Sequence, residues 1–344
     1  MDEPFEVGTS QLTSPVVDVH GHTLDLAFKA QRRFHAELGG LTDVPLMRAG
    51  GVTGQLTACW VPDASIGGPH GSHHPLRDVL RMIDYLLCEL DSDADKHACL
   101  ATSAGDIEAA WHDGTTAFVL GLEGGDSVQG DPAVLRILYR LGVRHLGLVH
   151  EGRNTMGTAT QVWDGPDMRL YDSHRDSAGG LTDAGKRIIR EMNRLGMLVD
   201  VTHMIEACFW DALDVARAPV IVTHGNARSL NDTVRYLTDQ QIRAVAETRG
   251  LVCPSPTPLG PGNESASLKM LLDHIDYMVE LVGAEHVGFG TDLLDQNNGR
   301  PDGMRDISET GNIIKSLQAR GHSVEAINQI MGANFIRVFK AVAG

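Results

Sequence analysis

Histidines and acidic residues follow several short apolar runs of this sequence, at the positions where buried strands would end. Seven such residues follow six of the runs: His20, His22, Glu123, His150, His203, His224 and Asp292. Imidazole and carboxylate groups are the usual nitrogen and oxygen ligands of zinc, and a catalytic zinc site keeps one position open for water. The residue types therefore predict a site for divalent metal ions that activates water.

The spacing of these residues suggests how two ions would be shared. His20 and His22 flank a single glycine, and because side chains alternate between the faces of a strand, both rings point to the same side. Glu123 carries two oxygens and could bridge two ions, while His203 and His224 follow neighbouring strands and could share the second ion. Two ions about 3.5–4 Å apart can hold a bridging hydroxide and polarise a carbonyl group.

Each of these residues also has a purely structural interpretation. A single histidine at a strand end is more often a hydrogen-bonded structural residue than a ligand. Glu123 could mark a tight turn between glycines, and Asp292 could cap a helix. The coincidence at six strand ends favours the metal site, with Asp292 opposite the ions as the proton carrier. Other histidines lie in polar stretches and are expected to be solvated: His70, His73, His74, His112 and His174.

The elements that must carry these residues alternate between apolar runs and helical patterns. Eight runs are expected to form strands: 16–20, 54–62, 117–123, 144–150, 197–203, 219–224, 250–255 and 286–292. Continuous apolar runs are typical of parallel strands that are buried on both faces. Eight alternating units predict an α/β fold, a (β/α)8 TIM barrel. Catalytic groups of this fold lie where the carboxyl ends of the strands meet, so the binuclear metal site is expected at the C-terminal mouth.

Apolar residues recur at helical spacing between these runs. Helices are expected over 74–90, 181–196, 238–250 and 323–342. Gly196 is a natural stop for the second helix, and Thr238 with Gln241 forms a capping box at the start of the third. Two inserts rich in Gly, Asp and His, over 66–75 and 161–180, are expected to be surface loops.

Length and composition favour one large domain over residues 1–344, with a flexible N-terminal segment over 1–14. The formal net charge of −16 disfavours binding to nucleic acids, whose backbones are also negative. Five scattered cysteines without a CxxC pair argue against a disulfide framework and a thiolate zinc site. The N-terminus has no apolar run typical of a signal peptide, and no run of about 18 apolar residues occurs, so a cytoplasmic protein without membrane contact is expected.

Several motifs resemble those of the membrane (renal) dipeptidase family of zinc metallopeptidases. They are PVVDVHGHTLD, FVLGLEGGD, LGVRHLGLVHEGRN, GLTDAGKRIIREMNRLGMLVDVTH, PVIVTHGNAR, HIDYMVELVGAEHVGFGTDLLD and IMGANFIRVF. They run from about residue 15 to residue 340 and so cover nearly the whole chain. The resemblance implies an amidohydrolase-like (β/α)8 barrel with two Zn²⁺ ions per chain. By position, His20 would bind the first ion, Glu123 would bridge both, and His203 and His224 would bind the second.

The resemblance also implies three contacts with the substrate. His150 would touch the substrate carbonyl and stabilise the tetrahedral intermediate, Arg235 would bind the substrate carboxylate, and Asp292 would be the general acid and base. The chain departs from the family at His22, where the family has an aspartate. An HxH pattern is that of the wider metal-dependent amidohydrolases, so His22 is expected to bind the first ion with one negative charge fewer.

These observations favour a zinc-dependent dipeptidase that hydrolyses dipeptides or closely related N-acyl amino acids through a metal-bridging hydroxide. The expected partner is a small dipeptide-like molecule, and a homodimer is left open. A second interpretation keeps the machinery but assigns another substrate, a non-peptide amide, a lactam or a lactone. A third is a barrel whose site has decayed and which serves as a binding protein; the retained ligand set argues against it.

Overall fold

The computed structural model describes residues 12–33, 39–66, 71–94, 96–164, 167–173, 179–257, 265–294 and 300–344. The expectations for His70, for His174 and for residues 1–11 of the N-terminal segment fall outside these ranges.

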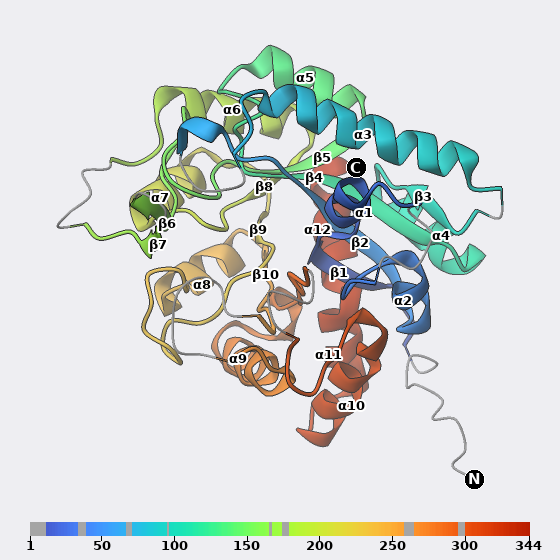
Figure 1. Ribbon diagram of the computed structural model, residues 1–344. Coiled ribbons are helices and arrows are strands. Elements are labelled where there is room, and N and C mark those ends of the chain that lie inside the picture. The colour runs from blue at the N-terminus through green and yellow to red at the C-terminus, as the bar shows by residue number, and fades with distance from the viewer. Residues whose placement is uncertain are drawn as a thin grey trace, which may run out of the picture.

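Parallel strands form a curled sheet in the middle of the molecule, and the longer helices lie around it (Figure 1). The strand order is β1 (Val16–Gly21), β2 (Val52–Trp60), β4 (Thr116–Glu123), β5 (Val143–Gly147), β8 (Leu198–Asp200), β9 (Val220–Val222) and β10 (Leu251–Val252). A further strand, β3 (Ala98–Leu100), pairs with β4 outside this path. This is the α/β barrel that the alternation of strands and helices predicts.

The barrel closes where residues 287–292 lie between β10 and β1. The N–H of Gly288 donates to the carbonyl of Val252 in β10, and the N–H of Val19 in β1 donates to the carbonyl of Phe289, each at 3.0 Å. The prediction of a regular eighth strand here is wrong, because the ladder pairing of this segment is a single bridge to Val252. Instead of a continuous ladder, single hydrogen bonds to β10 and to β1 hold this segment in the barrel wall.

Several strands end earlier than their apolar runs predict. β5 ends at Gly147 rather than at His150, although Leu148 and Val149 are fully buried. The runs predicted over 197–203, 219–224 and 250–255 likewise contain only two- or three-residue ladders. The loops at the barrel mouth are buried, so the apolar composition continues beyond the last ladder hydrogen bond.

The helices are α1 (Thr23–Ala30), α2 (Val44–Ala49), α3 (Pro75–Ser92), α4 (Ala104–Asp113), α5 (Pro132–Arg140), α6 (Asp183–Leu195), α7 (Glu206–Val215), α8 (Asp239–Glu247), α9 (Leu268–Val282), α10 (Gly311–Ala319), α11 (Val324–Asn328) and α12 (Asn334–Ala343). Short 3-10 turns cover Ala64–Ile66, Ala284–His286 and Ile307–Glu309. The predicted helix signals are confirmed: Thr238 and Gln241 form a capping box on α8, and Gly196 ends α6 with a φ of 73°.

The long helix predicted over 323–342 is interrupted. A π-helical turn, Gln329–Ala333, separates α11 from α12. Within it, Gly332 lies directly against the backbone of Pro15 and Val17, where a Cβ atom would overlap the carbonyl oxygen of Pro15. The absence of a side chain therefore lets the C-terminal helices press against the start of β1.

The insert over 161–180 is not only a loop. β6 (Gln161–Asp164) and β7 (Asp167–Leu170) form an antiparallel hairpin there, which the Gly- and Asp-rich composition does not predict. In the other insert, His73 and His74 are exposed as expected, and so is His112 on α4.

The apolar faces of the barrel elements form the core. All five cysteines are free thiols, and three of them are buried: Cys59, Cys208 and Cys253. Among the described residues, no helix is both long and apolar enough to cross a membrane.

Candidate metal centre

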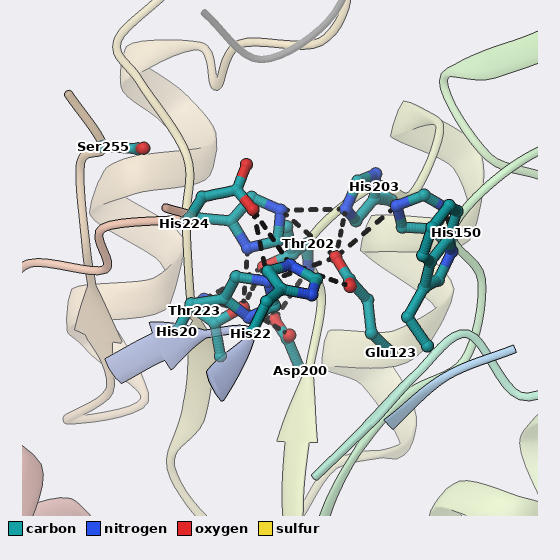
Figure 2. A network of polar contacts seen from close by, with 12 residues as sticks. His20, His22, Glu123, His150, Asp200, Thr202, His203, Thr223, His224 and Ser255 are labelled. Atoms are coloured by element: carbon teal, nitrogen blue, oxygen red, sulfur yellow. Dashed lines mark hydrogen bonds and ion pairs between the residues drawn. The ribbon is translucent and has the colours of Figure 1, made fainter. Parts of the chain in front are cut away.

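The strand-end residues converge on one carboxylate, as Figure 2 shows for Glu123 and the histidines around it. The Nε2 atoms of four imidazoles lie 3.3–3.6 Å from Glu123 Oε1, those of His20, His150, His203 and His224. The remaining ring, His22, has its Nε2 atom 3.6 Å from Glu123 Oε2 and 3.2 Å from Asp292 Oδ1. The structure thus brings together all seven residues at the barrel mouth.

The loop backbone, rather than the strands, aims two of these side chains. His203 and Asp292 have φ angles of 67° and 51°, in the left-handed region that residues with a side chain seldom adopt. Such a conformation costs roughly 1–2 kcal/mol for an ordinary residue and is concentrated at functional sites. The N–H of Asp292 donates to the carbonyl of His20 at 3.0 Å, which ties the loop to β1.

Hydrogen bonds behind the rings fix which nitrogens face the centre. His203 Nδ1 lies 3.2 Å from Gln161 Oε1, an acceptor, so we assign the ring proton to Nδ1. The Thr223 hydroxyl donates to Asp200 Oδ2 at 2.8 Å and can therefore accept from His224 Nδ1, 3.1 Å away. Both Nε2 atoms then present lone pairs toward Glu123, only 2.9 Å from each other.

These facing lone pairs fit a cation. Two acceptor nitrogens at this separation repel each other unless positive charge lies near both. His20 Nε2 and Glu123 Oε2 are also buried without a hydrogen-bond partner in the described part of the chain. Three overlapping groups of three side chains could each hold an ion: His20, Glu123 and His224; His20, His22 and Asp292; and Glu123, His150 and His203. Buried imidazoles around a carboxylate are a donor set suited to zinc.

The charges of the centre favour the same interpretation. Although burial opposes its charged form, the positive charge of His20 holds the pKa of Glu123 well below its ordinary value. Burial also opposes protonation of His20, but the carboxylates of Glu123 and Asp292 outweigh it and raise the pKa of His20 to about 9. The potential at this ring therefore stabilises positive charge, whether a proton or a metal ion carries it.

The other side of the centre favours neutral rings. Burial and the charge of Arg235 lower the pKa of His203 well below its usual value. Burial and the charge of His20 do the same for the pKa of His224. Neutral imidazoles are the form that binds metal ions, because only they offer a free lone pair.

Arg235 lies at the edge of the centre as a buried cation. It is 5% exposed, and no carboxylate in the described ranges lies within 4 Å of it. One guanidinium nitrogen lies 3.3 Å from His203 Nε2, and Arg235 Nε has no hydrogen-bond partner among the residues that the structure describes. Burial lowers the pKa of Arg235 to about 10, so it stays charged at neutral pH. Together with His203 it lines a cavity of about 590 Å³, where an anion would neutralise it.

Two side chains are more accessible than the rest of the centre. The side chain of Asp292 is 19% exposed and that of His150 is 14% exposed, against 6% or less for Glu123 and the other four rings. A molecule entering the mouth would therefore meet these two groups first.

A comparison with known protein families identifies the family of the chain that carries this metal centre. The family model of membrane dipeptidase, peptidase family M19, matches residues 9–344. The chain belongs to this family.

The curated relatives include dipeptidase tcpJ of Claviceps purpurea, 33% identical over 274 residues, and dipeptidase aclJ of Aspergillus oryzae, 31% identical over 317 residues. These matches cover 78% and 90% of this chain but 61% and 72% of the relatives, so the chain spans about three fifths of tcpJ. The family and these names support a hydrolase.

Solved structures show the same fold at lower identity. Dipeptidase AC, a metallopeptidase, has a TM-score of 0.83 and 24% identity, over 96% of this chain and 99% of that one. A metallopeptidase from Rhodobacter sphaeroides, solved with a phosphinate mimic of the dipeptide L-Ala-D-Ala, has a TM-score of 0.82 and 24% identity, over 95% and 99%. The probable dipeptidase PvdM from Pseudomonas aeruginosa has a TM-score of 0.81 and 21% identity, over 96% of each chain.

Sequence reasoning did not find the residues that support the rings. Asp200 and Thr223 lie close to His203 and His224 in the chain, so their positions beside the ligands could have been noticed. Gln161 gave no such signal, because it lies in the insert that was expected to be a loop and meets His203 only in three dimensions.

Proposed function

We propose that this chain is a zinc-dependent dipeptidase that hydrolyses the amide bond of dipeptides or closely related N-acyl amino acids. The observation that carries the proposal is the cluster of five imidazoles around Glu123, four of them buried, with two Nε2 lone pairs facing each other. Family membership and the dipeptidase names of the relatives support the reaction class. The dipeptide mimic bound to the Rhodobacter sphaeroides protein supports the substrate class.

In this proposal the ligands divide between two ions. His20 and His22 would hold the first, His203 and His224 would hold the second, and Glu123 would be a ligand shared by both. Two zinc ions bound there would supply an activated water as nucleophile and a Lewis acid that polarises the scissile carbonyl.

Three further side chains perform the remaining steps. Arg235 binds the substrate carboxylate, because a planar guanidinium matches a carboxylate with two charge-assisted hydrogen bonds. His150 donates a hydrogen bond to the carbonyl oxygen and stabilises the negative charge that develops on it. Asp292 accepts the proton of the attacking water and transfers it to the leaving amine.

Replacing Arg235 by methionine tests this substrate class. We expect Arg235→Met to raise KM for dipeptides with a free carboxylate and to leave the slow reaction of amidated dipeptides nearly unchanged. The loss in kcat/KM should be on the order of 2–4 kcal/mol, because a buried ionic hydrogen bond disappears. Steady-state kinetics on matched acid and amide substrates measure the difference.

Arg243→Met is the matched control, because this arginine lies on the exposed side of α8 and donates to the carbonyl of Leu281. Equal losses on the acid and the amide would assign Arg235 to the fold. The alternative substrate, a non-peptide amide, lactam or lactone, would then be favoured.

Replacing His22 tests the first metal site. We expect His22→Ala to lose one zinc ion preferentially, since the side chain is 4% exposed and faces Glu123 and Asp292 rather than His203. His22→Asp should restore zinc binding, because it places a carboxylate ligand at this position. Elemental analysis of the purified variants measures the stoichiometry, and the exposed His112→Ala is the control. Full zinc content and full rate in His22→Ala would show that the ring is not a ligand.

A further inference from the structure

His150 has an unusual hydrogen-bond partner on the side facing away from the metal centre. The indole Nε1 of Trp60 lies 3.1 Å from His150 Nδ1. An indole N–H can only donate, so the Nδ1 atom that receives this bond must carry a lone pair. The proton of the neutral ring is then on Nε2, the atom that lies 3.5 Å from Glu123 Oε1.

The sheet register holds Trp60 in place for this contact. Trp60 is the last residue of β2 and is paired with Glu123, the last residue of β4. The ammonium group of Lys29 lies over the indole, 4.7 Å from its centroid, and such cation–π contacts favour one ring orientation. Two strand ends therefore fix the indole beside the carboxylate on which the imidazoles converge.

A second neighbour of His150 favours the opposite tautomer. Glu151 Oε1 lies 3.5 Å from His150 Nδ1 and is 8% exposed, and a carboxylate beside Nδ1 would favour a proton there. The other oxygen of Glu151 accepts a hydrogen bond from Trp163 at 2.7 Å. His150 Nδ1 thus contacts both a donor at 3.1 Å and an acceptor at 3.5 Å, and the shorter contact is that of the donor.

We propose that Trp60 is a positioning residue that keeps His150 in the Nε2–H tautomer, so that the ring donates toward the substrate carbonyl. The inference rests on the proposed function, in which His150 is a donor. With the proton on Nδ1 instead, Nε2 would be an acceptor and would repel the developing negative charge. In this proposal Trp60 reaches the reaction through its hydrogen bond to His150 Nδ1.

The test compares full-length zinc-loaded protein with its Trp60→Phe variant. The tautomer is measured by nitrogen NMR of the labelled histidine rings, with the His150 signals assigned by their loss in His150→Gln. We expect protonated Nε2 in the unaltered chain and a shift toward protonated Nδ1 in Trp60→Phe. The value of kcat should fall by roughly 10-fold or more, with KM nearly unchanged, because a transition-state hydrogen bond is lost. Zinc content should stay the same.

A double variant separates the tautomer from simple loss of packing. In Trp60→Phe/Glu151→Gln, the amide oxygen can accept from Trp163 while the amide nitrogen donates to His150 Nδ1. We expect this variant to regain the Nε2–H tautomer and much of the lost kcat, although the cavity left by the indole remains. Trp111→Phe, on α4, is the matched control for replacing a tryptophan.

Two results would overturn the inference. One is a proton on Nδ1 in the unaltered chain, and the other is an unchanged tautomer or an unchanged kcat in Trp60→Phe. If the unaltered chain hydrolyses no dipeptide, the proposed function fails, and the ring signals still decide whether Trp60 sets the tautomer.

Discussion

Removal of metal ions by a chelator is expected to abolish hydrolysis, and added zinc is expected to restore it. The reason is the ligand set: each buried ring would hold an ion through Nε2, and the His203 and His224 lone pairs face each other at 2.9 Å. Without the ions the site loses both its nucleophile and its Lewis acid. Elemental analysis should find up to two zinc ions per chain in the active protein.

The chelated protein should keep its fold, because the core of the barrel lies below the mouth. Circular dichroism before and after chelation is the control that separates loss of metal from unfolding. If the purified protein carries no metal and its activity does not change when a chelator is added, the proposed metal centre is refuted.

Asp292→Asn is expected to lower kcat by about 10²- to 10⁴-fold, the range typical of a general acid or base. Asparagine keeps the shape of the side chain and tolerates the left-handed backbone, here at a φ of 51°, better than most residues do. Zinc content should therefore change less than the rate. Initial rates and elemental analysis on the same preparations measure both quantities.

Asp113→Asn is a suitable control, because this aspartate lies exposed at the end of α4, away from the barrel mouth. Near-normal turnover in Asp292→Asn would assign Asp292 to the structure of the loop. A complete loss of one zinc ion would instead make it a ligand, a role that its 3.2 Å distance from His22 Nε2 allows.

The sequence predicted most of the fold because its signals are local. Continuous apolar runs, the capping box at Thr238 and the stop at Gly196 each depend on neighbouring residues. The structure confirms the two helix signals, whereas several strands end earlier than their apolar runs predict. The predictions of a regular eighth strand, of a loop over 161–170 and of an unbroken helix over 323–342 were wrong. Whether backbone groups form a β-ladder depends on which distant segment lies beside them, and the local amino-acid composition does not specify that segment.

The positions of the site residues followed from the same local signals. An apolar run that ends in His or Glu places that residue at the mouth of any parallel barrel, so the convergence on Glu123 could be predicted before the structure. The division of the ligands and the proton-carrier role of Asp292 were suggested by the residue types, and the roles of His150 and Arg235 by the resemblance alone; all of them stay predictions.

The sequence by itself determined which groups meet, and only the tertiary structure decided what each can do there. A histidine offers two nitrogens, and its own sequence does not say which one carries the proton. That choice depends on partners from other parts of the chain: Gln161 behind His203, Thr223 with Asp200 behind His224, and Trp60 beside His150. Hydrogen bonds act over about 3 Å, so these partners take effect only after the barrel has brought distant strands together.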